Sequence, residues 1–162
     1  MIVVADTSPL RYLIVLQQAD VLHALFQRVV IPEEVWLELR HPQAPDEVRR
    51  WIAAAPAWLE IHPASPAPDA LTDLDAGEAA AIRLAGQHQG SAFLLMDDAK
   101  GRREAARRGI PSTGTLGVLR AASQRRLLSL RDVLPRLLLT NFFIASNLVD
   151  ALIAEEESSR RS

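Results

Sequence analysis

The chain has 162 residues, 49% of them hydrophobic and 23% charged, which is ordinary for one globular domain with a real core. It has no cysteine, which excludes disulfides, thiolate metal sites and cysteine nucleophiles. The formal net charge of −2 argues against non-specific coating of nucleic acid but leaves room for a local basic patch.

No apolar run approaches the ~20 residues that cross a bilayer, so we expect a soluble, cytoplasmic protein with no membrane partner. Apolar strands alternate with helices along the chain. Strands are predicted at residues 2–5, 28–32, 58–63, 91–98 and 110–113. Helices are predicted at residues 10–26 (broken near 18–20), 32–40, 46–55, 75–89, 99–109, 115–127, 129–139 and 146–157, with a Pro-rich loop at 64–73. This alternation predicts an α/β fold with a parallel sheet covered on both faces.

Asp6 lies at the end of the first predicted strand, in the stretch VVADTSPL. Ser8 followed by Pro9 is typical of a helix cap and first turn, so the cap role is filled without Asp6. Open parallel sheets bind ligands at the carboxyl ends of their strands. A functional role and a structural role for Asp6 are about equally supported by this stretch alone.

The same arrangement recurs in SAFLLMDD, where an apolar strand ends in Asp97 and Asp98. Asp98 is better placed to cap the following helix, which leaves Asp97 at the strand end. If the two strands are neighbours, Asp6 and Asp97 lie within several ångströms, because strands are about 4.8 Å apart. Acids that close together without a cation repel each other, so the pattern indicates a divalent-metal site.

Two further acids have competing interpretations. Asp75-Ala-Gly-Glu78 has the spacing of a capping box, yet the start of that helix faces the same rim, so Glu78 could also be a metal ligand. Glu38 follows the second strand by more than a helical turn, and its position alone favours a surface residue. Lys100 and Arg103 follow Asp97 on one predicted helix and form either a solvated face or a strip that grips substrate phosphate.

The stretches VVADTSPL, LDAGEAAAIRLA, LLMDDAKGRREAARRGI and TGTLGVL, in this order, resemble the PIN-domain ribonucleases. More narrowly, they resemble a bacterial and archaeal branch with the pattern D-T-S-P-L, L-D-x-G-E and D-D-x-x-G-R. The resemblance runs from Ile2 to about Ile153 and implies a three-layer α/β/α sandwich around a central parallel sheet. We therefore expect a single PIN-like domain over residues 1–153 and a frayed tail over 154–162.

The resemblance also implies a function, namely cleavage of RNA by carboxylate-bound Mg²⁺ or Mn²⁺, often by a toxin paired with an antitoxin protein. It marks four acids as metal ligands and catalytic residues, Asp6, Glu38, Glu78 and Asp97, with Asp98 as a substitute ligand. Ser8 would orient the Asp6 carboxylate. Thr113 and Thr115 stand near where many members carry another acid, so they become supporting hydroxyls rather than ligands.

Two alternatives remain beside the metal-dependent ribonuclease. One is a catalytically inactive PIN-like module that binds RNA or protein, which the hydroxyls at Thr113 and Thr115 keep open. The other is a phosphotransferase with Asp6 as nucleophile, although such enzymes typically carry a second acid where Ser8 stands here. A homodimer is expected in either case, because the late helices hold more apolar positions than one buried face requires.

Overall fold

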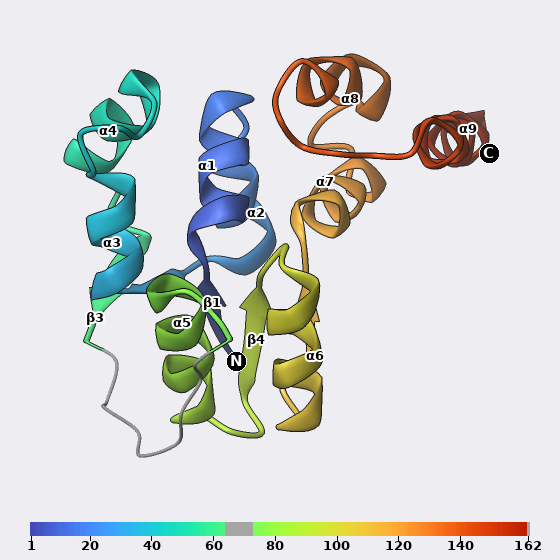
Figure 1. The fold of residues 1–162 in the computed structure, drawn as a ribbon. Helices are drawn as coiled ribbons and strands as arrows, with labels where there is room; N and C mark the ends of the chain where they lie inside the picture. The colour runs from blue at the N-terminus through green and yellow to red at the C-terminus, as the bar shows by residue number, and fades with distance from the viewer. Residues whose placement is uncertain (64–72, 162) are drawn as a thin grey trace. The chain divides into compact units, whose positions relative to one another are not determined.

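A computed structural model describes residues 1–63 and 73–161 of the chain. Within these residues, five parallel strands form one sheet in the order β3-β2-β1-β4-β5 (Figure 1). The strands are β1 (Ile2–Ala5), β2 (Val29–Pro32), β3 (Leu59–His62), β4 (Ala92–Leu95) and β5 (Ser112–Thr113). All five lie where the sequence predicts strands. The predicted Pro-rich loop at 64–73 falls outside the described residues except for Asp73.

Helices flank the sheet, which confirms the predicted three-layer α/β/α sandwich. They are α1 (Thr7–Val15), α2 (Asp20–Phe26), α3 (Glu33–Leu39), α4 (Asp46–Ala53), α5 (Ala76–Gly86) and α6 (Ala99–Arg107). The predicted break near 18–20 is present, since α1 ends at Val15 and Gln17 adopts a positive φ of 59°. Helix α5 packs on the sheet against β1, β2 and β4 (Figure 1).

The start of α1 differs from the sequence prediction. The helix begins at Thr7, so Asp6 rather than Ser8 occupies the N-cap position, with φ −82° and ψ 173°. The side chain of Asp6 makes no capping hydrogen bond there. Ser8 therefore lies inside the first turn, and its hydroxyl is available for another partner.

The core under the site is built from continuous apolar strands, as a sheet covered on both faces requires. Val4, Val30 and Leu94, from three neighbouring strands, are each at most 1% exposed. Small residues of α5, Ala81 and Ala85, join the same cluster and let the helix lie close to the sheet. This packing fixes the strand ends from which the acidic side chains emerge.

The chain divides into two compact units, Met1–Thr115 and the remainder from Leu116. The second unit contains most of α7 (Thr115–Gln124) together with α8 (Leu130–Leu138) and α9 (Ser146–Arg161). The frayed tail expected from residue 154 is not present as far as Arg161, because α9 continues to that residue. The expectation of one domain over 1–153 stays a prediction. In the described parts of the chain, no helix is long and apolar enough to cross a membrane.

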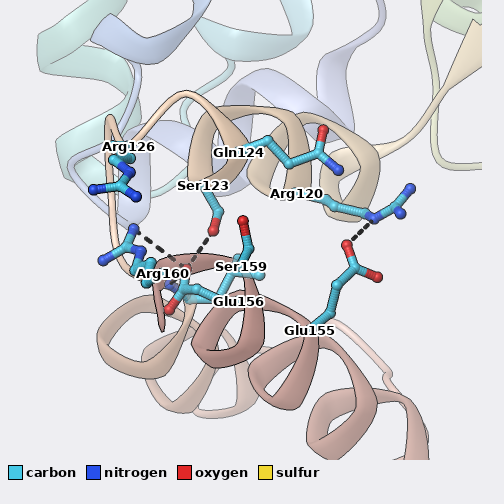
Figure 2. A pocket seen from close by; sticks show the side chains of 9 residues that line it. Arg120, Ser123, Gln124, Arg126, Glu155, Glu156, Ser159 and Arg160 are labelled. Atoms are coloured by element: carbon cyan, nitrogen blue, oxygen red, sulfur yellow. Dashed lines mark hydrogen bonds and ion pairs between the residues drawn. The ribbon is translucent and has the colours of Figure 1, made fainter. Parts of the chain in front are cut away.

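A buried carboxylate ties the helices of the second unit together (Figure 2). Glu156 on α9 is 6% exposed and accepts hydrogen bonds from the Ser123 hydroxyl and from the backbone N–H groups of Leu130 (2.6 Å) and Arg131 (3.3 Å). The guanidinium of Arg160 lies 3.6 Å away. Glu156 thus caps the start of α8 from a different helix, a role for which its sequence neighbourhood gives no signal.

Candidate active site

Asp6 is the buried centre of the acidic cluster. Its backbone N–H donates to the carbonyl of Leu95 (2.9 Å), which extends the β1–β4 pairing to the strand ends. Its side chain is 4% exposed, and Oδ1 has no hydrogen-bond partner within the described structure. A buried carboxylate oxygen without a donor is costly, so this atom is poised for a ligand that the protein itself does not supply.

The charge around Asp6 has a direct effect on its titration. Burial raises the pKa of Asp6 to about 7, the backbone N–H of Thr7 opposes this, and the carboxylates of Asp75, Glu38 and Asp97 raise it further. These three side-chain charges are all negative. A cation at this place would relieve the repulsion of the whole group.

Asp97 lies at the end of the neighbouring strand, as the sequence predicts. Strands β1 and β4 pair in parallel with Ala5 opposite Leu95, so Asp6 and Asp97 leave the sheet at the same edge. Asp97 accepts hydrogen bonds from Ser8 Oγ (2.8 Å), Thr115 Oγ1 (2.7 Å) and the Thr115 backbone N–H (2.6 Å). The expectation that Ser8 orients Asp6 is wrong, because α1 starts two residues earlier than expected and the Ser8 hydroxyl donates to Asp97 instead.

Glu38 enters the cluster from α3. Thr7 Oγ1 donates to its Oε2 at 2.5 Å, and the charge of Glu38 is one of those that raise the pKa of Asp6. The carboxylate also rests on α5 at Gly77, where a Cβ atom would come within 2.6 Å of Glu38 Oε1. Position alone favoured a surface residue, and the resemblance correctly brought Glu38 to the cluster. Thr7 was not predicted as a site residue, although its position directly after Asp6 indicates that it lies at the same strand end.

Glu78 lies at the start of α5, where Asp75 is the N-cap. The Asp75 side chain accepts from the Glu78 backbone N–H at 2.8 Å, so half of the predicted capping box is confirmed. Burial, a hydrogen bond with Asp75 and the charges of Asp75, Asp98 and Asp6 raise the pKa of Glu78 to about 9. The side chain therefore belongs electrostatically to the acidic cluster. Asp75, treated in the sequence only as a cap, belongs to it as well.

The other predicted residues lie around this cluster. Asp98 is the N-cap of α6 and accepts from the Gly101 backbone N–H at 2.8 Å, the capping role expected for it. Thr113 is half-buried in β5, and its carbonyl accepts from the Met96 N–H at 2.8 Å. Lys100 and Arg103 are exposed on α6, and their predicted contact with phosphate stays a prediction.

The chemistry of the donor set fits a hard divalent cation. In the described ranges 1–63 and 73–161, no group of three or more His, Asp or Glu side chains is preassembled around one point. The fit rests instead on the orphaned Oδ1 of Asp6 and on two glycines. A Cβ at Gly77 would reach within 2.6 Å of Glu38 Oε1, and one at Gly114 within 2.6 Å of Asp97 Oδ1. Carboxylate oxygens are the ligands that Mg²⁺ and Mn²⁺ prefer, and at both glycines the missing side chain leaves room beside one of them.

Comparison with protein families gives one match over almost the whole chain. A family model described as a PIN domain matches residues 2–158. No curated protein matches the chain.

Proposed function

The chain belongs to the PIN-domain family, and from this premise we propose that it is a metal-dependent ribonuclease that hydrolyses phosphodiester bonds in RNA. PIN domains are generally nucleases, so the family supports nuclease chemistry as such. The observation that carries the proposal is the buried carboxylate of Asp6, whose Oδ1 has no partner among the described residues and whose pKa is raised by three acidic neighbours. A purely structural acid at a strand end has no need of such surroundings.

The residues divide the work as follows. Asp6, Glu38, Glu78 and Asp97 would hold Mg²⁺ or Mn²⁺, which when bound would lower the pKa of a water and offset the charge of the phosphate. Thr7 fixes Glu38, while Ser8 and Thr115 fix Asp97, which keeps the carboxylates in place before the substrate arrives. One carboxylate of the set takes the proton that the attacking water releases.

The test is cleavage of a fluorescent single-stranded RNA by metal-free protein to which Mg²⁺ or Mn²⁺ is added back. We expect cleavage that saturates with metal and falls at least ~100-fold in Asp6→Asn. Glu47→Gln, an exposed acid at the start of α4, serves as the control and should keep full activity. Cleavage that survives both chelation and Asp6→Asn would come from a contaminant and would contradict the proposal.

The alternative is a PIN-like module that binds RNA or protein without cleaving it. The hydroxyls of Thr113 and Thr115, together with the lack of a preassembled metal site in the described part of the chain, favour it. The same assay separates the two, because the module would bind the RNA at every metal concentration and never shorten it.

We extend the proposal to the toxin of a toxin–antitoxin pair that forms a homodimer. Leu139 and Phe143 of the second unit are each 88% exposed, an apolar surface typical of a protein–protein contact. Induced expression should arrest bacterial growth, and Asp6→Asn should abolish the arrest. Sedimentation at micromolar concentration should give a dimer, and a clean monomer would contradict that part.

A further inference from the structure

Arg102 lies on the flank of α6 that borders the acidic cluster. Gly101 and Ala105 are buried and define the packed face of this helix, with Gly101 against the Met96 side chain. At 100° per residue, Arg103 points about 200° away from Gly101, on the side opposite the packed face. Arg102 points between these two directions, at the edge of the packed face, whereas Arg103 points away from that face.

The exposed side chain of Arg102 places its guanidinium next to Gly114, the glycine that follows β5. A Cβ atom at Gly114 would lie 2.6 Å from Asp97 Oδ1 and 3.1 Å from Arg102 Nη1. The arginine head and the Asp97 carboxylate therefore share the space that the missing side chain leaves open. Gly114 is itself buried, so this space belongs to the built site rather than to the outer surface.

No ion pair with a described residue occupies the guanidinium of Arg102. Among the described residues, its side chain has no hydrogen bond or ion pair, whereas Arg107 and Arg108 on the same helix both pair with Glu104. The oxygens of Asp97 already accept from Ser8 and Thr115. An unpaired guanidinium beside a group of acids is available to an anionic ligand from outside.

We propose that Arg102 binds the phosphodiester group of the RNA beside the carboxylate cluster, an inference that rests on the proposed ribonuclease function. A phosphate approaching Asp6, Glu38, Glu78 and Asp97 meets like charge, and a neighbouring cation of the protein offsets that repulsion. The planar guanidinium offers two parallel donors to two phosphate oxygens, which also orients the group. The other interpretation is that Arg102 only balances the charge of Asp97.

The experiment compares Arg102→Ala and Arg102→Lys with Arg107→Ala, an exposed arginine of the same helix that pairs with Glu104, as the matched control. Steady-state cleavage of single-stranded RNA is measured over a series of KCl concentrations and over a Mn²⁺ titration. We expect kcat/KM to fall about 10- to 100-fold in Arg102→Ala, and the slope of log KM against log salt to decrease by about one. Arg102→Lys should keep the slope and lose part of the rate, and Arg107→Ala should match the wild type within about twofold.

The outcomes separate the two proposals. Wild-type cleavage with Arg102→Ala equal to Arg107→Ala overturns the role of Arg102 and leaves the ribonuclease intact. A rise in the Mn²⁺ concentration needed for half-maximal rate, with the salt slope unchanged, also overturns it, because that result assigns Arg102 to charge balance at Asp97. A wild-type protein that never cleaves RNA overturns the proposed function and this inference with it. Arg102→Gln, which removes the charge and keeps much of the side chain, provides the same comparison if the alanine variant does not fold.

Discussion

Thr115 holds the carboxylate of Asp97 with two groups at once, its backbone N–H to Oδ1 (2.6 Å) and its hydroxyl to Oδ2 (2.7 Å). Thr115 is fully buried, and Ser8 adds a third donor at 2.8 Å. The sequence pattern presented Asp97 as an uncompensated acid, whereas three hydrogen-bond donors contact its two carboxylate oxygens. Asp97 is therefore fixed in place by the protein before a cation binds.

Thr115→Val tests this support, since valine keeps the branched shape and loses only the hydroxyl. A hydrogen bond to a charged group contributes about 1.5–3 kcal/mol, so we expect a fall of that order in the free energy of unfolding. RNA cleavage should fall about tenfold, because the supporting partner of a metal ligand is lost. Thr113→Val is the control and should change stability by less than about 0.5 kcal/mol. Equal stability of the two variants would contradict the role of the hydroxyl.

Gly77→Ala tests whether activity depends on the close contact between the Glu38 carboxylate and α5. The added Cβ would come within 2.6 Å of Glu38 Oε1, and the carboxylate, as the end of a flexible side chain, can move away. We therefore expect a folded protein whose cleavage rate is reduced about tenfold. Gly86→Ala, near the end of the same helix, meets nothing within 4 Å and should gain up to about 1 kcal/mol of stability with full activity. Full activity of both variants would remove Glu38 from the site.

Glu78→Gln separates the capping role from the metal role. Burial, the hydrogen bond with Asp75 and the surrounding acids raise the pKa of Glu78 to about 9, so at neutral pH without metal its carboxyl group is protonated. Glutamine resembles that neutral form, and the melting temperature of the metal-free protein should be nearly unchanged. Metal-dependent cleavage should fall by about an order of magnitude or more, since an amide cannot supply the charge. Unchanged cleavage, beside an inactive Asp6→Asn, would return Glu78 to capping.

Asp6 should make the metal-free protein less stable as the pH rises. Its pKa is about 7 in the folded state, against an ordinary value of 3.8, so the folded state binds the proton more tightly than the unfolded one. The resulting stabilisation is complete below pH ~4 and is lost as the pH rises through about 7, for a total of about 4 kcal/mol. Urea unfolding in EDTA at several pH values should show this loss in the wild type and not in Asp6→Asn. Parallel pH profiles of the two proteins would contradict it.

Local rules were enough to predict the strands, the helices and the meeting of Asp6 with Asp97, because an apolar run that ends in an acid is a short-range signal. The partners of the hydroxyls were not predictable in the same way. A helix start moved by two residues, with the N-cap at Asp6 instead of Ser8, changes which carboxylate each hydroxyl reaches. The position of Glu38 in the site depends on how α3 packs against α5. No local sequence pattern contains this information, so only the family resemblance predicted it.

Glu156→Gln should destabilise the second unit far more than the same change one residue earlier. Burial alone would raise the pKa of Glu156, but hydrogen bonds from the Leu130 backbone, Ser123 and the Arg131 backbone hold it below its usual range. An amide nitrogen cannot accept these donors, so we expect the free energy of unfolding to fall by about 1–3 kcal/mol. Glu155→Gln removes only an exposed pair with Arg120 and should cost less than about 1 kcal/mol.

The pH dependence gives the Glu156 prediction a second readout. Because the folded pKa of Glu156 is depressed, its stabilisation is present above the unfolded pKa and is lost as the pH falls through the folded one. The difference between wild type and Glu156→Gln should therefore be full at pH ~7 and shrink towards pH ~3. Thermal unfolding followed by far-UV circular dichroism at both pH values measures it. A constant difference across this range would show that Glu156 acts through packing rather than through its charge.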